Sequence, residues 1–200
     1  MSENSDDSRD GMDPRVRRTR DRLGDALWEL MQERPLESIT VQQVLERAAV
    51  GRSTFYAHFR DKDDLFLSDL DEFLVLMSTL LAQRGDGSDR VVAAAEFFAH
   101  VGESPQYFRA LVASGRLADF RDLAQEHYAR GIEQRLATLP RAAHLPAERR
   151  VALSQAFAGA FLSLFQWWID HGTPGTPLEM DRLFHRLVWS GVDAPREPQS

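Results

Sequence analysis

The sequence predicts an all-α protein with about nine helices. Apolar side chains recur at helical spacing in segment after segment, and no stretch shows the sustained alternation of apolar and polar residues typical of a β-strand. Glycine and proline are concentrated between the periodic segments, where they would separate one helix from the next. We expect helices at about 14–33, 40–49, 52–60, 61–84, 88–101, 103–114, 116–139, 146–171 and 178–191.

The helices between residues 40 and 84 have the clearest starting signals. Thr40 and Gln43 have the T-x-x-Q spacing of a capping box. Gly51 is in the cap position of the short helix that follows, where glycine is only slightly worse than serine. Asp61 is placed to cap the next helix, and further acids in its first turn suit the helix dipole. The sequence also places Ser88 as the cap of the 88–101 helix.

The composition excludes several classes of protein. Apolar residues make up 43% of the 200 residues, which is enough for a sizeable core. The absence of cysteine excludes disulfides and zinc–thiolate sites, and no histidine–carboxylate cluster suggests a metal or another cofactor. The N-terminus is acidic rather than signal-like, and no apolar run reaches the roughly 20 residues of a membrane span. We therefore expect a cytoplasmic protein without membrane contact.

The charge of the chain is unevenly distributed. The formal net charge is -7, but residues 14–62 hold ten basic and seven acidic residues, including the only lysine. A basic block inside an acidic chain indicates a polyanionic partner, and the alternative is chance clustering on a solvated surface.

Two short helices joined by about four residues lie inside this basic block. In a helix-turn-helix, the second helix enters the major groove of DNA and presents its N-terminal residues to base edges. Phe55 and Phe59 would anchor that helix through its buried side. Its early exposed residues can bond to bases or phosphates, and arginine can do so with two donors to guanine. These residues are Arg52, Ser53 and Thr54.

Residues 23–66 resemble the DNA-binding domain of TetR-type transcriptional regulators. The family pattern runs roughly T-h-x-x-h-h-x-x-A-G-V-S-x-x-T-h-Y-x-H-F-x-x-K-x-x-h, with h for apolar, and it appears as "TVQQVLERAAVGRSTFYAHFRDKDDLF" without gaps. Two positions depart from it: Ala49 replaces the turn glycine, and Gly51 replaces the usual serine cap. Alanine in a left-handed turn would cost about 1 kcal/mol.

The resemblance implies a DNA-contacting surface at the matching positions. Thr40 and Gln42 would contact the DNA backbone or a base, and Tyr56 and Lys62 would hold phosphates. His58 has two open roles, phosphate donor or packing residue. These positions are Thr40, Gln42, Arg52, Ser53, Thr54, Tyr56, His58 and Lys62.

Five arginines lie at the start of the first helix. Cations at a helix N-terminus oppose the helix dipole, so they gain when phosphates are near. We expect Arg17 and Arg18 to contact DNA as part of a basic arm, and the alternative is a solvated, frayed helix start. The five are Arg15, Arg17, Arg18, Arg20 and Arg22.

The resemblance also implies a C-terminal dimerisation surface. Residues 151–168 are apolar almost all round, and such a helix must be buried on both sides. Small residues on it would allow a second helix to approach closely, so we expect a four-helix interface between two chains, with a monomer that has a larger core as the alternative. The expected interface residues are Ala156, Gly159, Ala160, Ser163, Trp167, Leu183 and Leu187.

A ligand pocket for a hydrophobic or aromatic small molecule is the second property that the family implies for the C-terminal helices. Apolar pockets with few polar groups suit such ligands, although aromatic residues at helical spacing also build ordinary cores. The expected pocket residues are Phe97, His100, Val101, Phe108, Leu111, Phe120, His127, Phe161, Phe165 and Trp168.

These inferences combine into one domain plan and two competing functions. We expect a disordered tail at 1–13, a DNA-binding domain at 14–62, a ligand-binding and dimerisation domain at 63–192 and a second tail at 193–200. The favoured function is a ligand-responsive repressor that binds a palindromic operator on double-stranded DNA as a homodimer. The alternative is a co-regulator that acts through protein partners with weakened DNA binding. An all-α enzyme is not expected, because no nucleophile–base motif or glycine-rich phosphate loop is present.

Overall fold

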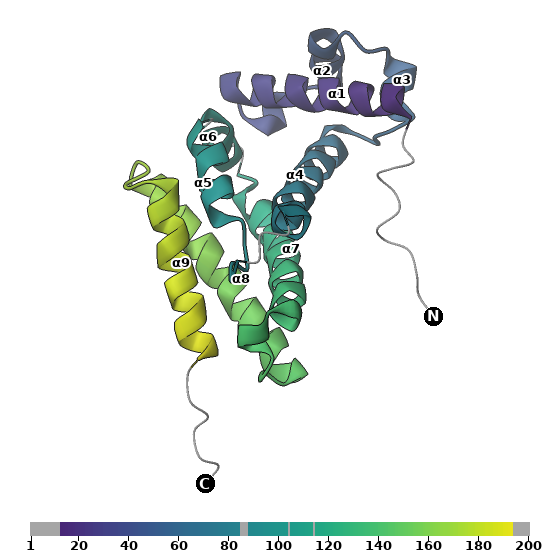
Figure 1. The fold of residues 1–200 in the computed structure, drawn as a ribbon. Helices are drawn as coiled ribbons and strands as arrows, with labels where there is room; N and C mark the ends of the chain where they lie inside the picture. The colour runs from purple at the N-terminus through teal and green to yellow at the C-terminus, as the bar shows by residue number, and fades with distance from the viewer. Residues whose placement is uncertain (1–12, 85–87, 104, 114, 194–200) are drawn as a thin grey trace. The chain divides into compact units, whose positions relative to one another are not determined.

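The computed structural model describes residues 13–84, 88–103, 105–113 and 115–193 (Figure 1). Apart from Asp13 and Asp193, the two expected tails lie outside these residues. The all-α prediction is confirmed, since the described residues contain helices and no strand. The α-helices are α1 (Pro14–Glu33), α2 (Val41–Ala48), α3 (Arg52–Tyr56), α4 (Lys62–Arg84), α5 (Ala94–Glu103), α6 (Pro105–Ala113), α7 (Leu117–Thr138), α8 (Ala147–Asp170) and α9 (Pro177–Val192). Short 3-10 turns lie at Leu36–Ser38 and Pro140–Ala142.

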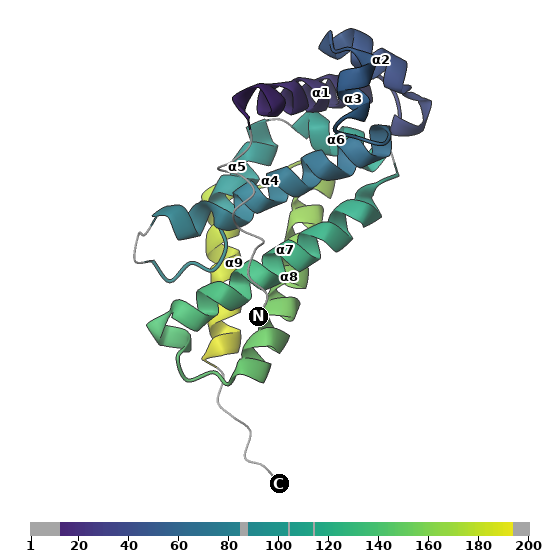
Figure 2. The same ribbon diagram turned by 90° about the vertical axis from the view of Figure 1, so that its right-hand side faces the viewer.

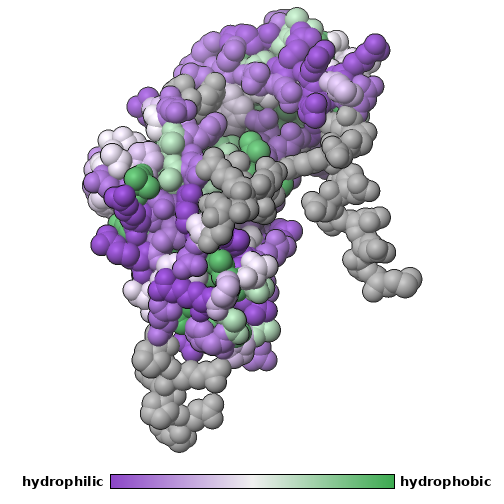
Figure 3. Space-filling model, in the orientation of Figure 1, coloured by the Kyte–Doolittle hydropathy of each residue, from purple (hydrophilic) through white to green (hydrophobic). Residues whose placement is uncertain are grey.

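The chain forms two compact units. The N-terminal unit contains Met1–Leu70 and Arg109–Gly115, and the C-terminal unit contains Asp71–Phe108 and Arg116–Ser200. The helix α4 therefore begins in the first unit and ends in the second. Each unit has buried apolar side chains of its own, while the surface in Figure 3 is mostly hydrophilic, with hydrophobic residues in small patches.

In the N-terminal unit, α2 packs on α1 and α3 packs on α2 (Figure 1). Phe55 of α3 is fully buried and Phe59 is nearly so, with their ring centroids 5.7 Å apart, so the inward orientation expected for both rings is confirmed. The helix itself ends at Tyr56, earlier than expected. Phe59 N–H still donates to the Phe55 carbonyl at 2.9 Å, which keeps the chain tightly turned after the helix.

The turn between α2 and α3 has the left-handed alanine that the sequence indicated. Ala49 has φ 50° and ψ 48°. Its N–H donates to the Glu46 carbonyl at 3.3 Å, and the Val50 N–H donates to the Leu45 carbonyl at 3.1 Å. This pair of bonds is the Schellman pattern that ends many helices, usually with glycine at the left-handed position. Gly51, with φ -73° and ψ 150°, then starts α3 without a side-chain cap.

Two other expected caps are present in this unit. Thr40 and Gln43 form a complete capping box, in which the Thr40 hydroxyl accepts from the Gln43 N–H and the Gln43 side chain accepts from the Thr40 N–H at 2.9 Å. Asp61 caps α4, because its carboxylate accepts from the Asp64 N–H at 2.8 Å. Local sequence signals therefore set the starts of α2 and α4 correctly.

The C-terminal unit surrounds an aromatic core. The helix α8 packs along α7, and α9 packs on both α5 and α8 (Figure 2). Phe165 lies at the centre, with its ring centroid 4.8 Å from that of Phe97 and 4.6 Å from that of Phe108. Tyr128 and Phe161 stack edge to face at 4.7 Å. Edge-to-face packing of this kind adds stability beyond the area that the rings bury.

The helix α5 begins at Ala94, so the expected helix start and cap at Ser88 were wrong. Residues before Ala94 are held by long-range contacts instead. Arg135 of α7 donates to the carbonyls of Ser88 at 2.6 Å and Arg90 at 3.0 Å, and the Val91 N–H donates to Nε2 of His185 at 3.1 Å. These backbone groups are therefore satisfied without a helix.

A partly buried ion cluster ties the start of α5 to α9. Arg90 donates to Glu96 Oε2 at 2.5 Å and to Asp181 Oδ1 at 2.9 Å, and Asp181 also accepts from the Ala95 N–H at 3.2 Å. Burial alone would raise the pKa of Asp181, but its contacts with His185 and Arg90 outweigh burial and hold that pKa below the ordinary 3.8. The Asp181 carboxylate therefore stabilises the folded state.

Replacing Ala49 by glycine should raise the free energy of unfolding by about 1 kcal/mol, because glycine adopts a positive φ without the steric cost that alanine carries. The matched change Ala48→Gly, one residue earlier in the helix, should lower it by about 1 kcal/mol. Urea denaturation of the full chain measures both. Equal effects of the two changes would contradict the left-handed assignment.

Replacing Asp181 by alanine should lower the free energy of unfolding at pH 7 by about 3 kcal/mol, because it breaks a partly buried ion pair. The folded pKa of Asp181 is depressed, so its contribution is complete well above pH 3.8 and is lost as the pH falls through the lower folded value. The difference from wild type in urea denaturation should therefore shrink toward pH 3. The control Glu126→Ala removes an exposed pair with Arg130 and should change stability by less than about 1 kcal/mol.

Candidate nucleic-acid interface

The first turn of α3 presents polar side chains to solvent. Arg52, Ser53 and Thr54 are all exposed, and Tyr56 is 52% exposed. Burial of Phe55 on the opposite side of the same short helix fixes which residues face outward. The structure therefore brings together a cation, two hydroxyls and a phenol on one exposed helix end, which is the chemistry that reads base edges and phosphates.

Arg52 is linked to α2 through an amide rather than a carboxylate. Its Nη2 donates to Gln42 Oε1 at 3.3 Å, and Gln42 Nε2 donates in turn to Glu46 Oε1 at 2.8 Å. Arg52 forms no ion pair with the residues that the structure describes. Its positive charge is thus oriented but not neutralised, which leaves it available to an anionic partner.

Three other expected DNA contacts have side chains that are engaged or partly buried, unlike the exposed residues of α3: Thr40, Lys62 and His58. Thr40 is exposed, but its hydroxyl already serves the capping box of α2. The Lys62 side chain is 19% exposed, with Nζ 3.6 Å from Asp63 Oδ1. His58 is half-buried, with its ring centroid 6.4 Å from that of Phe59, and this position is compatible with both of its expected roles.

The arginines at the start of α1 divide into two groups. Asp13 caps this helix by accepting from the Arg15 N–H at 2.8 Å, and Arg15, Arg17 and Arg18 are exposed near that end. The guanidinium of Arg20 lies over the ring of Phe59, 4.9 Å from its centroid. Arg20 is thus half-buried, whereas Arg15, Arg17 and Arg18 are exposed.

Arg22 contacts the turn between α2 and α3. Its Nη2 donates to the carbonyls of Ala48 and Ala49, the latter at 3.1 Å. From the sequence, Arg20 and Arg22 were grouped with the basic arm, because spacing along the chain does not show that their side chains contact Phe59 and the α2–α3 turn.

The residues expected to line a ligand pocket are not all gathered in one place. Most are buried in the aromatic core of the C-terminal unit, whereas His100 is exposed, with its ring centroid 5.2 Å from that of Phe73. His127 Nε2 lies 2.7 Å from Asp71 Oδ1. Leu111 is buried but belongs to the N-terminal unit. The core members are Phe97, Val101, Phe108, Phe120, Phe161, Phe165 and Trp168.

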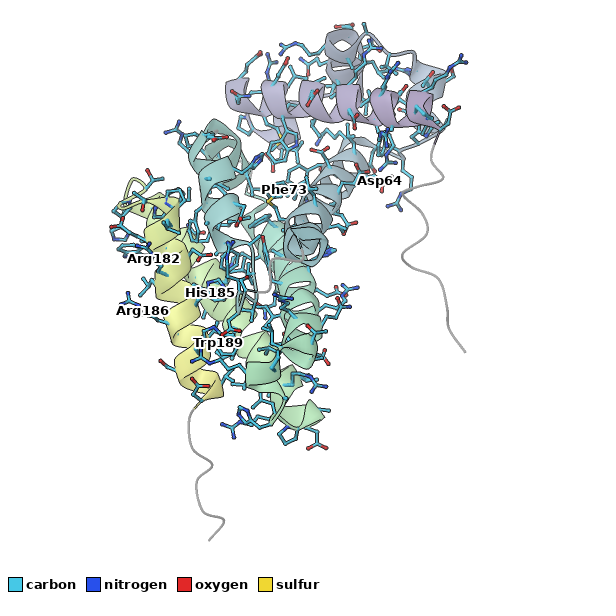
Figure 4. All side chains as sticks on the ribbon, viewed as in Figure 1. Asp64, Phe73, Arg182, His185, Arg186 and Trp189 are labelled. Carbon is cyan, nitrogen blue, oxygen red and sulfur yellow. The ribbon has the colours of Figure 1, made fainter. Side chains whose placement is uncertain are left out.

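A groove along α9 was missed by the sequence. It encloses about 1320 Å³ and is lined in part by Arg90, Asp181, His185, Arg186 and Trp189, several of which are labelled in Figure 4. The available signal was the spacing of Asp181 and His185, two polar residues four positions apart on the inward side of the last helix. Among the lining residues, Arg90 is paired with Asp181, and Arg141 is paired with Asp89 and Asp193.

The residues expected at a dimer interface lie on exposed parts of α8 and α9. Ala156, Ser163 and Trp167 are exposed, whereas Gly159 and Ala160 are half-buried. On α9, Leu183 is 43% and Leu187 is 52% exposed. Large apolar side chains exposed in this way favour contact with a partner surface.

No cluster of three or more metal-ligating carboxylates and imidazoles occurs among the described residues. Within the same residues, the helices are too short or too polar to cross a membrane.

Comparison with known proteins finds one family match and several solved structures of similar fold. The family model described as "Bacterial regulatory proteins, tetR family" matches residues 23–68. Among solved structures, the "Dihydroxyacetone kinase operon activator DhaS" is 14% identical with a TM-score of 0.68, covering 87% of this chain and 96% of that chain. A TetR transcriptional regulator from Streptococcus agalactiae is 24% identical with a TM-score of 0.58, covering 87% and 95%.

A third structure is the fatty acid degradation regulator FadR from Bacillus halodurans, which is 12% identical with a TM-score of 0.62 and covers 86% of this chain and 98% of that one. At these identities the likeness shows the fold, while the family match at 23–68 covers the segment that contains α2 and α3. Residues 23–68 therefore resemble the tetR family of bacterial regulatory proteins, and the chain has the fold of solved structures described as TetR transcriptional regulators.

Proposed function

We propose that the protein is a ligand-responsive repressor that binds a palindromic operator as a homodimer. The observation that carries the DNA-binding part is the exposed first turn of α3, with an oriented and un-neutralised Arg52, inside a segment that matches the tetR family. The sign of regulation is not a property of the fold, since one structural neighbour is described as an activator. Repression is therefore tested by measuring transcription from the promoter upstream of the gene with and without the protein. A repressor predicts more transcription when the protein is absent.

Base reading in this proposal centres on Arg52. Arginine can donate two hydrogen bonds to O6 and N7 of guanine, and the neighbouring Ser53 and Thr54 can bond to bases or phosphates. Tyr56, half of whose surface is exposed, is placed to donate to a phosphate. The exposed Arg17 and Arg18 would add sequence-independent attraction to the DNA backbone.

Dimerisation would use the exposed apolar residues of α8 and α9. Leu183, Leu187 and Trp167 are large apolar side chains that are 43%, 52% and 45% exposed in the single chain, and Ala156 is small enough to let a second helix approach. A twofold dimer presents two α3 helices, so it reads two half-sites related by the same twofold axis. That symmetry is why we propose a palindromic operator.

A ligand response would act through α4, the helix that belongs to both units. In the C-terminal unit, α4 contacts α7 through Asp71 and His127 at 2.7 Å, and Phe73 lies 6.0 Å from Phe97 of the aromatic core, measured between ring centroids. A hydrophobic or aromatic molecule that separated these rings would displace α4. The proposal is that this displacement lowers operator affinity.

Replacing Arg52 by alanine should weaken binding to the DNA upstream of the gene about ten- to hundredfold, which corresponds to the loss of about 1–3 kcal/mol from one base contact. Replacing Lys62 by alanine should weaken binding to all sequences and reduce the slope of log affinity against log salt by about 1. Fluorescence anisotropy with labelled duplexes at several salt concentrations measures both.

The control for these two variants is Arg130→Ala, which removes an exposed arginine on α7 and should leave DNA binding unchanged. If Arg52→Ala bound the upstream DNA as tightly as the wild type, α3 would not be the reading helix. If the wild-type chain bound no DNA at low salt, a role through protein partners would replace the proposal.

Replacing Leu187 by glutamate should convert the dimer to a monomer, because it places a charge in the centre of the proposed apolar interface. The matched control is Val112→Glu on α6, which changes a residue of similar exposure outside α8 and α9 and should leave the dimer intact. Light scattering coupled to size exclusion gives the mass of each variant. A monomeric wild-type chain, or a dimeric Leu187→Glu variant, would contradict the proposed interface.

A further inference from the structure

The end of α2 is held by an arginine from a different helix. The last carbonyls of a helix have no partner within it and carry the negative end of the helix dipole. Arg22 of α1 donates from Nη2 to the last carbonyl of α2, that of Ala48, and to the carbonyl of Ala49 just after the helix. One guanidinium therefore supplies both hydrogen bonds and positive charge at the point where the chain leaves α2 for α3.

This turn lacks two local sources of stability. Ala49 has a left-handed backbone that alanine tolerates poorly, and Gly51 has no side chain with which to cap α3. A Cβ at Gly51 would meet only Thr54 Oγ1, at 3.9 Å, so crowding does not require the glycine there. The turn is therefore held largely by its Schellman hydrogen bonds and by Arg22.

Two neighbouring arginines, Arg47 and Arg20, contact other residues. Arg47 of α2 binds Glu29 at 3.2 Å and Glu33 at 2.8 Å, which fastens α2 to α1 without touching the turn. Arg20 lies on Phe59 and donates to Ser68 at 2.7 Å. Only Arg22 among these three contacts the residue with the left-handed backbone.

We propose that Arg22 is a positioning residue for DNA reading, which fixes the α2–α3 turn and so directs Arg52 at the groove without contacting DNA. This role rests on the proposed DNA-binding function. A phosphate contact and a positioning contact differ in their salt dependence. Each lost phosphate contact reduces the slope of log affinity against log salt by about 0.9, whereas a misdirected α3 loses affinity at every salt concentration.

The test compares Arg22→Met, which keeps the aliphatic stem but removes the donors, with Ala49→Gly and with the double variant. Amide hydrogen exchange of the free full-length chain is measured at Val50, whose N–H bonds to Leu45, and at the fully buried Ile132 of α7 as a reference. Binding to the upstream DNA is measured as a function of salt. Arg130→Met serves as the matched control, because it changes an exposed arginine of the other unit.

We expect Arg22→Met to speed exchange at Val50 about tenfold with Ile132 unchanged, in line with the loss of one charged hydrogen bond. Specific affinity should fall about tenfold with an unchanged salt slope, and Ala49→Gly should restore most of that loss, since glycine relieves the strain that Arg22 offsets. Arg130→Met should match the wild type.

Three results would overturn the role. A salt slope reduced by about 0.9 in Arg22→Met would make Arg22 a phosphate contact. Unchanged Val50 exchange, or unchanged affinity, would show that the turn does not depend on it. Failure of the wild-type chain to bind DNA would overturn the proposed function itself. This outcome can be distinguished from failure of the role of Arg22, because Val50 exchange is measured without DNA.

Discussion

The burial of Phe55 is the contact on which the exposed polar surface of α3, the proposed DNA-reading surface, depends. A helix of five residues is far below the length at which isolated helices are stable in water, so α3 exists because its one fully buried ring is packed among the side chains of the N-terminal unit. That single anchor also decides which residues point outward. The Schellman turn before α3 and the Asp61 cap after it then fix both ends of a segment too short to hold its own shape.

The parts of this site that follow from local chemistry could be predicted from the sequence. The capping box of Thr40 and Gln43 involves residues three positions apart, the inward side of α3 follows from the apolar residues Phe55 and Phe59, and the left-handed Ala49 follows from the resemblance to the turn glycine of the family pattern. Contacts between distant segments could not be predicted. The sequence alone does not show that Arg22 contacts the turn 26 positions later in the chain. Arg22 was therefore assigned to the basic arm with the other arginines of the first helix.

The same limit explains the errors in the C-terminal unit. Ser88 resembles a helix cap, yet α5 begins at Ala94 because Arg135 and His185, from 47 and 94 positions away, take the backbone groups of the intervening segment. Aromatic spacing likewise identified the core residues but not whether they enclose a pocket, since the same rings at the same spacing pack against one another. In the proposed function, a ligand would have to separate the packed rings of this aromatic core.

The central claim is that α3 reads a DNA sequence, and the ratio of two affinities tests it most directly. The full-length chain is titrated at one fixed salt concentration with the duplex from upstream of its gene and with a scrambled duplex of the same length and composition. A reading helix predicts that the upstream duplex binds at least about a thousandfold more tightly. A ratio near one, with binding that vanishes as salt is raised, would show attraction to the phosphate backbone alone and would contradict the account.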